Sequence, residues 1–125
     1  MIIGLGIDLV ETKRVVRELG GGPWRPRDGV FTEAEISYCN RGRQPERRYA
    51  ACFAAKEATL KALGADVADL GIFREAEVRL DGGGDCRVLL GNRLRAVAGK
   101  LGARHINLSV AVQKERVVAM VILES

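Results

Sequence analysis

Hydrophobic and polar positions along this chain follow two different periods. Residues 2–10 are almost continuously apolar, which is typical of a buried strand. Near the other end, apolar residues alternate with polar or small ones over 106–113, and an apolar run follows at 117–123 after a charged turn. This pattern predicts a terminal β-hairpin. Residues 75–80 and 86–90 flank a glycine-rich turn and predict a second hairpin in the middle of the chain.

Apolar residues at helical spacing predict four helices, at residues 12–19, 32–39, 45–64 and 94–101. The first ends at a glycine run that begins with Gly20. Thr32 and Glu35 have the spacing of a capping box at the start of the second. Pro45 suits the first turn of the long third helix and Gly64 its C-terminal cap.

Helices are concentrated in the first half of the chain and strands in the second. This order predicts an α+β fold, with a mostly antiparallel sheet packed on helices, rather than a parallel βαβ array. A length of 125 residues suits a single domain spanning residues 1–125, and 47% hydrophobic residues exclude a disordered chain. Because a domain of this size leaves much surface exposed, oligomerisation is a way to bury more apolar area.

The N-terminal segment and the cysteines of the sequence indicate that the protein works in a reducing cytoplasm. The apolar N-terminal run lacks a basic leader and a cleavage site, so it is interpreted as a strand, and no segment approaches membrane-spanning length. Cys39, Cys52 and Cys86 are an odd number without Cys-x-x-Cys spacing. This argues against a disulfide framework and against zinc.

The net charge of +4 favours an acidic partner: a nucleic acid, a polyanionic cofactor or an acidic protein. The sequence shows no zinc-finger spacing, helix-turn-helix pattern or aromatic-rich RNA-binding strand, and aromatic residues make up only 5%. Nucleic acid is therefore the weakest of the three hypotheses.

Three residues carry the candidate chemistry. Glu57 and Lys61 lie one turn apart on the predicted long helix, which places a carboxylate beside an ammonium group. Asp8 supplies a second acid if the fold brings the first strand against this helix. Two carboxylates suit Mg²⁺, and a lysine suits phosphate. The alternatives are an ordinary surface ion pair for Glu57 and Lys61, and a turn or helix cap for Asp8.

Two basic clusters accompany this set. Lys13, Arg14 and Arg17 share one side of the first helix, which is either a solvated face or a docking site for an acidic helix. Arg47 and Arg48 offer guanidinium groups for adenosine phosphates, or simply make the start of the long helix soluble.

Residues 6–8 (Gly-Ile-Asp) and 53–62 (Phe-Ala-Ala-Lys-Glu-Ala-Thr-Leu-Lys-Ala) resemble the motifs of the holo-acyl-carrier-protein synthases, the small 4'-phosphopantetheinyl transferases. Residues 10–11, 30–35 and the closing pair of strands extend the resemblance over nearly the whole chain. Within the second motif, Lys56 is expected to point away from Glu57, to the surface or to a partner.

The resemblance implies Mg²⁺-dependent transfer of 4'-phosphopantetheine from coenzyme A to a serine of an acyl carrier protein, with release of 3',5'-adenosine bisphosphate, in fatty acid or polyketide biosynthesis. It implies Asp8 and Glu57 as metal ligands, Glu57 and Lys61 as catalytic residues, and Lys61 and Ser109 as coenzyme contacts beside the arginine pair. Arg14 matches the basic helix with which the family docks its carrier protein. A homotrimer with sites between subunits is also implied, whereas the general base is left open.

The chain departs from the family pattern at several coenzyme contacts. Cys52 replaces a frequent arginine, and Asp85 stands where the family carries the lysine of a Gly-Lys-Pro turn. Two histidines expected near the C-terminus are missing, one of them replaced by Val112, and His105 is one position out of register. Two interpretations follow: an active transferase with a reshaped coenzyme site, or a catalytically altered paralogue that binds a carrier protein.

Overall fold

The computed structural model describes residues 1–19, 29–67, 69–80 and 85–125. The elements are β1 (Ile2–Glu11), α1 (Thr12–Leu19), α2 (Glu33–Asn40), α3 (Pro45–Leu63), the 3-10 helix η1 (Leu70–Glu75), β2 (Ala76–Leu80), β3 (Cys86–Leu90), α4 (Asn92–Leu101), β4 (His105–Gln113) and β5 (Arg116–Glu124). Each predicted helix and strand is present, with bounds shifted by at most two residues. The pattern does not predict η1, whose first turn is closed by the Asp69 side chain accepting from the Ile72 N–H. The predicted glycine stop at 20–23 and most of the turn at 81–85 lie outside the described residues.

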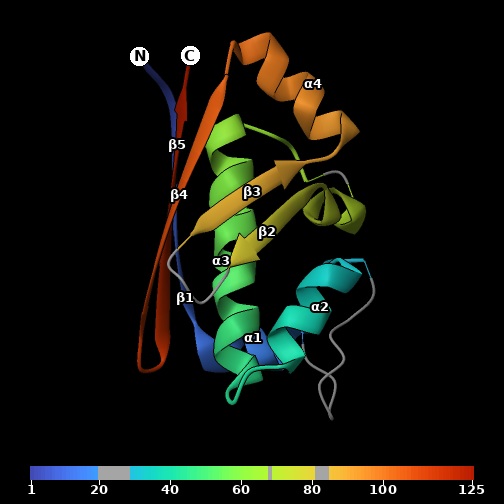
Figure 1. Cartoon of the computed structure of the whole chain (residues 1–125), viewed down its shortest axis with the longest axis vertical. Helices are drawn as coiled ribbons and strands as arrows, with labels where there is room; N and C mark the ends of the chain where they lie inside the picture. The colour runs from blue at the N-terminus through green and yellow to red at the C-terminus, as the bar shows by residue number, and fades with distance from the viewer. Residues whose placement is uncertain (20–28, 68, 81–84) are drawn as a thin grey trace.

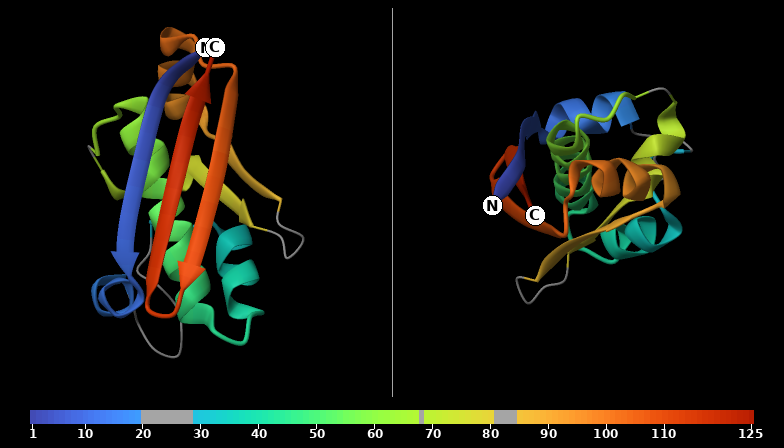
Figure 2. Two further views of the ribbon diagram at one scale, coloured as in Figure 1. Left: turned by 90° about the vertical axis from the view of Figure 1, so that its left-hand side faces the viewer. Right: turned by 90° about the horizontal axis from the view of Figure 1, so that it is seen from above.

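Three long strands form one antiparallel sheet in the order β1-β5-β4, and β2 pairs with β3 in a separate antiparallel ribbon. The predicted terminal hairpin is β4–β5, and β1 adds to its free side along almost the whole length of β5. The two ends of the chain therefore lie side by side, as Figure 2 shows. The α+β fold with a mostly antiparallel sheet is confirmed.

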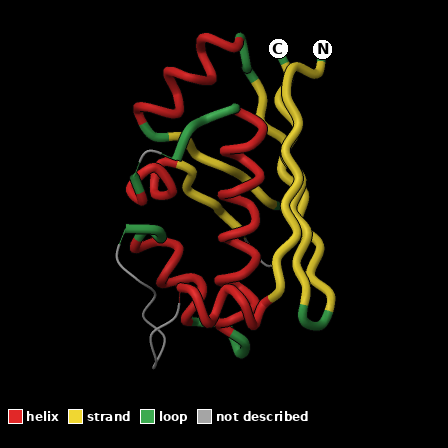
Figure 3. The backbone as a smooth tube through the Cα atoms, turned by 180° about the vertical axis from the view of Figure 1, so that it is seen from behind, coloured by secondary structure: helices red, strands yellow, loops and turns green. Residues whose placement is uncertain are grey.

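Helix α3 is the central element of the molecule. It lies between the three-stranded sheet and a second layer made of α2 and the β2–β3 ribbon (Figures 1 and 3). Twelve of its nineteen residues are buried, and they include a series of alanines. A helix covered on several sides needs small side chains, because they let neighbouring backbones approach closely. Within the described part of the chain, no helix has both the length and the apolarity to cross a bilayer.

Helix α2 begins with the predicted capping box. The Glu35 N–H donates to Thr32 Oγ1 at 3.2 Å, and the Thr32 N–H donates back to Glu35 Oε1 at 2.8 Å. The other oxygen of Glu35 accepts from the Val78 N–H at 2.7 Å, so the same carboxylate also joins α2 to β2.

The expectation that Lys56 lies at the surface is wrong. Its side chain is fully buried, and Nζ lies 2.7 Å from Glu35 Oε1. The ammonium group also donates to the carbonyl oxygens of Phe73 at 2.7 Å and Ala76 at 3.1 Å. The prediction failed because it assumed that α3 has a solvent-exposed side at this position, whereas α2 and β2 cover it. Lys56 thus links α2, α3 and the segment that enters β2.

Candidate active site

The site begins with an unusually close contact between β1 and α3. A side chain at Gly6 would clash with the carbonyl oxygen of Ala58, and its Cβ would lie 2.7 Å from the Ala62 backbone nitrogen. A Cβ at Gly4 would lie 2.7 Å from the carbonyl oxygen of Ala62. Glycines on the strand and alanines on the helix therefore let two backbones touch. This contact brings the first half of β1 against the C-terminal half of α3.

Asp8 extends from β1 toward α3, as the predicted site requires. It is only 7% exposed, and its Oδ1 accepts from Lys61 Nζ at 2.7 Å. Lys61 itself is about half exposed, so it is free to move toward a bound anion. The second oxygen, Asp8 Oδ2, is buried and has no hydrogen-bond partner among the described residues. A buried carboxylate oxygen without a donor is costly unless a cation completes it.

Glu57 is the third residue of the candidate site, beside Asp8 and Lys61. Burial raises the pKa of Glu57, and the neighbouring Asp8 carboxylate raises that pKa further, whereas Lys61 opposes the shift. Two adjacent carboxylates, one with an unpaired oxygen, fit a divalent cation. No cluster of three or more potential metal ligands occurs in the described ranges. A metal ion here would thus have two protein ligands and take its others from phosphate and water, as Mg²⁺ commonly does.

The basic side of α1 lies next to this group. Lys13, Arg14 and Arg17 are all exposed, and Arg14 donates to Glu18 Oε1 at 3.0 Å. The charge of Arg14 is near enough to Glu57 to oppose the rise in the pKa of Glu57. A partner that docks on this side of α1 would therefore reach the carboxylates.

Arg47 and Arg48 lie elsewhere in the same chain. Arg48 precedes Glu57 by nine residues, or roughly two and a half turns, and so projects from the opposite side of α3. Both arginines line a cleft of about 480 Å³, together with Arg43 and with Val112 of β4. Within one chain the structure does not bring this arginine cleft to the two carboxylates.

Ser109 is also separate from the acids. Along β4 the exposed positions alternate with half-buried ones, and Ser109 is exposed, on the face of the sheet that points away from α3. Asp8 projects from the inner face. Within a single chain, the sheet therefore separates Ser109 from Asp8.

The three residues that depart from the family pattern lie in different environments. Cys52 is fully buried, with its sulfur 3.8 Å from that of Cys39, so it offers nothing to a coenzyme. Asp85 is exposed and lies 3.6 Å from Arg87, which partly offsets its charge. Val112 is about half exposed at the arginine cleft.

Lys56 and Gly6 are the positions that sequence reasoning missed. The signal for Lys56 was present, because Cys52 and Leu60 lie one helical turn before and after it and a capping-box glutamate was available as its partner. For Gly6 the signal was a glycine inside an apolar strand, which often marks a close backbone approach.

Known proteins that resemble this chain do so over nearly its full length, and they belong to one family. The model of the 4'-phosphopantetheinyl transferase superfamily matches residues 4–121. A holo-[acyl-carrier-protein] synthase of Koribacter versatilis is 37% identical over 124 residues, covering 99% of both chains. One of Moorella thermoacetica is 38% identical, covering 96% of this chain and 92% of the relative.

Solved structures show the same relationship. The holo-[acyl-carrier-protein] synthase of Neisseria meningitidis superposes with a TM-score of 0.83 at 28% identity, covering both chains completely. That of Bacillus anthracis, solved with CoA (3',5'-ADP), gives a TM-score of 0.76 at 31% identity, covering 100% of this chain and 98% of that one. The chain therefore belongs to the 4'-phosphopantetheinyl transferase superfamily, as a divergent member of its holo-acyl-carrier-protein synthase enzymes.

Proposed function

We propose that this enzyme transfers 4'-phosphopantetheine from coenzyme A to a serine of an acyl carrier protein, in a Mg²⁺-dependent reaction that releases 3',5'-adenosine bisphosphate. The observation that carries the proposal is the convergence of Asp8, Glu57 and Lys61 where β1 meets α3. The names of the relatives and the coenzyme in the Bacillus anthracis structure support the choice of substrates.

The reaction needs charge compensation and alignment more than covalent chemistry. The serine hydroxyl oxygen forms a bond to the β-phosphorus of coenzyme A, while the bond from that phosphorus to the bridging oxygen breaks and adenosine bisphosphate leaves. Mg²⁺, held by Asp8 and Glu57, would neutralise the diphosphate charge. Lys61 acts as a mobile point charge beside the same phosphates. The hydroxyl proton passes to Glu57, to a water held by the two carboxylates or to a group of another subunit, and the base is left open among these three.

The coenzyme contacts are best understood if the site lies between subunits of a homotrimer. The outer face of the sheet carries exposed apolar side chains: Leu5, Ile7, Leu9, Val118 and Met120, each between 37% and 60% exposed. Such a face favours association, because burying it removes apolar surface from water. Assembly would also let Ser109 and the Arg47–Arg48 cleft of one subunit approach the acids of another.

The carrier protein is proposed to dock on α1 through Lys13, Arg14 and Arg17. An acidic partner helix would be attracted to this exposed side and guided to the carboxylates beside Arg14. Such contacts mainly increase the association rate and weaken with salt. The whole chain is proposed to act as one domain in a reducing cytoplasm.

A transfer assay tests the proposal. Incubation with an apo carrier protein, coenzyme A and Mg²⁺ should add one phosphopantetheine to the carrier, measured by mass spectrometry. Asp8→Ala and Glu57→Ala should abolish the addition, whereas Arg14→Ala should mainly slow capture of the carrier. Absence of any modification with several carrier proteins would rule out the transferase.

A second candidate is a paralogue that binds a carrier protein without transferring the group. The buried Cys52 and the exposed Asp85 favour it, since neither can hold a phosphate. It predicts salt-sensitive carrier binding without measurable affinity for coenzyme A. Calorimetry that shows tight, Mg²⁺-linked coenzyme binding would exclude it.

A further inference from the structure

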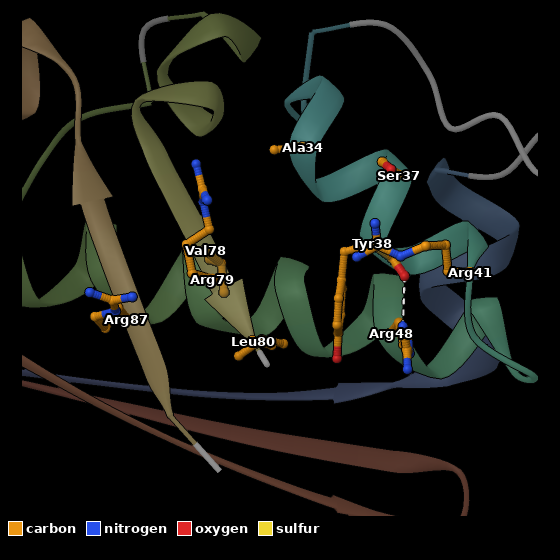
Figure 4. A pocket seen from close by; sticks show the side chains of 9 residues that line it. All are labelled: Ala34, Ser37, Tyr38, Arg41, Arg48, Val78, Arg79, Leu80 and Arg87. Carbon is orange, nitrogen blue, oxygen red and sulfur yellow. Dashed lines mark hydrogen bonds between the residues drawn. The ribbon is translucent and has the colours of Figure 1, made fainter. Parts of the chain in front are cut away.

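A second arginine-lined cleft lies between α2 and the β2–β3 ribbon. It has a volume of about 680 Å³, within the range of small-molecule sites. Arg79 and Arg87 line it from the ribbon, and Arg41 and Arg48 line it from the helices, as Figure 4 shows. No acidic side chain is among the described residues that line it.

The two ribbon arginines oppose each other directly. Arg79 of β2 and Arg87 of β3 are register partners, so their charges share one face of a two-stranded ribbon. Like charges in this position destabilise the pairing. Each is only partly compensated at the surface, Arg79 by Glu77 at 3.0 Å and Arg87 by Asp85 at 3.6 Å, and all four side chains keep contact with solvent. An anion between the guanidinium groups would relieve the repulsion.

The opposite wall is already ordered for binding. Arg48 donates to the Tyr38 carbonyl oxygen at 2.7 Å, and its guanidinium lies 4.2 Å from the centre of the Tyr38 ring. A held guanidinium group loses little freedom when it binds an anion. Ser37 adds a hydroxyl at the rim of the cleft.

We propose that this cleft is a binding site for a small phosphorylated compound, next to the coenzyme cleft, with which it shares Tyr38 and Arg48. Guanidinium groups on two walls suit the tetrahedral oxygens of a phosphate or diphosphate. A nucleic acid is a poorer fit, because Tyr38, the aromatic residue among the described ones that line the cleft, already has Arg48 over its ring. The Tyr38–Arg48 pair also lines the cleft that holds Arg43 and Arg47, and so forms the boundary between the two.

Calorimetric titration with inorganic pyrophosphate, in the presence of a metal chelator, tests the site. Without divalent ions, binding at the two carboxylates is suppressed. The wild type should bind pyrophosphate, and the double variant Arg79→Gln/Arg87→Gln should bind it at least about tenfold more weakly, because two charge-assisted contacts are lost. The matched control Arg104→Gln/Arg116→Gln removes the same charge from two exposed positions outside both clefts. It should bind like the wild type.

Thermal unfolding provides a second measurement. Pyrophosphate should raise the melting temperature of the wild type and of the control but not of the cleft variant. Without ligand, the cleft variant should melt close to the wild type, since the like-charge pair that it loses offsets the loss of the surface ion pairs with Glu77 and Asp85. Failure to fold therefore does not imitate loss of the site.

Four results would overturn the proposal. The first is that the wild type does not bind pyrophosphate, and the second is that both double variants weaken binding equally. The third is that coenzyme A displaces pyrophosphate and the cleft variant has a raised KM for coenzyme A. The fourth is that the cleft binds single-stranded nucleic acid but not pyrophosphate. The titration requires neither carrier protein nor turnover. The cleft and the transferase function can therefore fail independently.

Discussion

Replacing the buried Lys56 with methionine should destabilise the protein severely. Methionine has a similar length but removes the ammonium group that lies 2.7 Å from Glu35 Oε1. The Glu35 carboxylate would stay buried without its cation, and the carbonyl oxygens of Phe73 and Ala76 would lose their donor. Breaking a buried ion pair on one side costs about 3–5 kcal/mol, because it leaves an uncompensated charge.

That loss is a large part of the total stability, which for a domain is about 5–15 kcal/mol. Urea denaturation followed by circular dichroism measures it as a change in the free energy of unfolding. Lys100→Met on α4 is the matched control, since Lys100 is exposed and its replacement should cost less than about 1 kcal/mol.

The double variant Lys56→Met/Glu35→Gln separates charge from packing. Its neutral amide can still accept a hydrogen bond from the Thr32 or Val78 N–H, so it should regain at least half of the lost stability. A cost below about 1 kcal/mol for Lys56→Met alone, with an unchanged denaturant slope, would refute the buried ion pair as a major source of stability.

Three further predictions concern the site and the assembly. Gly6→Ala should cost about 3 kcal/mol or more and abolish stabilisation by Mg²⁺, because a Cβ would clash with the Ala58 carbonyl oxygen. In the same denaturation assay the control Gly99→Ala should be neutral or stabilising, because a Cβ at that position meets open space. Glu57→Gln should stabilise the metal-free protein at neutral pH, because a carboxyl group with a raised pKa in the folded state costs stability as the pH rises through that pKa. The gain should vanish in acid, and a stability difference that does not change with pH would contradict the raised pKa. Ile7→Asp should convert a trimer to monomers in sedimentation analysis, and a monomeric wild type would disprove the trimer.

Local features of the fold were readable because they depend on neighbours in sequence. The capping box of Thr32 and Glu35 and the start of α1 follow from side chains within a few residues of one another. The same holds for the spacing of Glu57 and Lys61, which any helix would place one turn apart. The helices, the hairpins and one half of the candidate site were therefore predictable.

The surroundings of α3 were not predictable in the same way. An amphipathic stripe shows which side of a helix is buried, but α3 is covered on several sides and has no such stripe. The expectation for Lys56 failed for this reason. The position of Arg48 on the side opposite Glu57 follows from helix geometry, but only the packing of α2 and β2 shows that a cleft lies there.

The sequence by itself determined the α-helices and β-strands, the family motifs and the one-turn spacing of Glu57 and Lys61. Only the tertiary structure decided that Asp8 meets them, because this contact joins residues more than fifty positions apart through the close approach that Gly6 permits. It also separated the arginines and Ser109 from the acids within one chain. Long-range contacts depend on how whole elements pack, and local spacing carries little information about that.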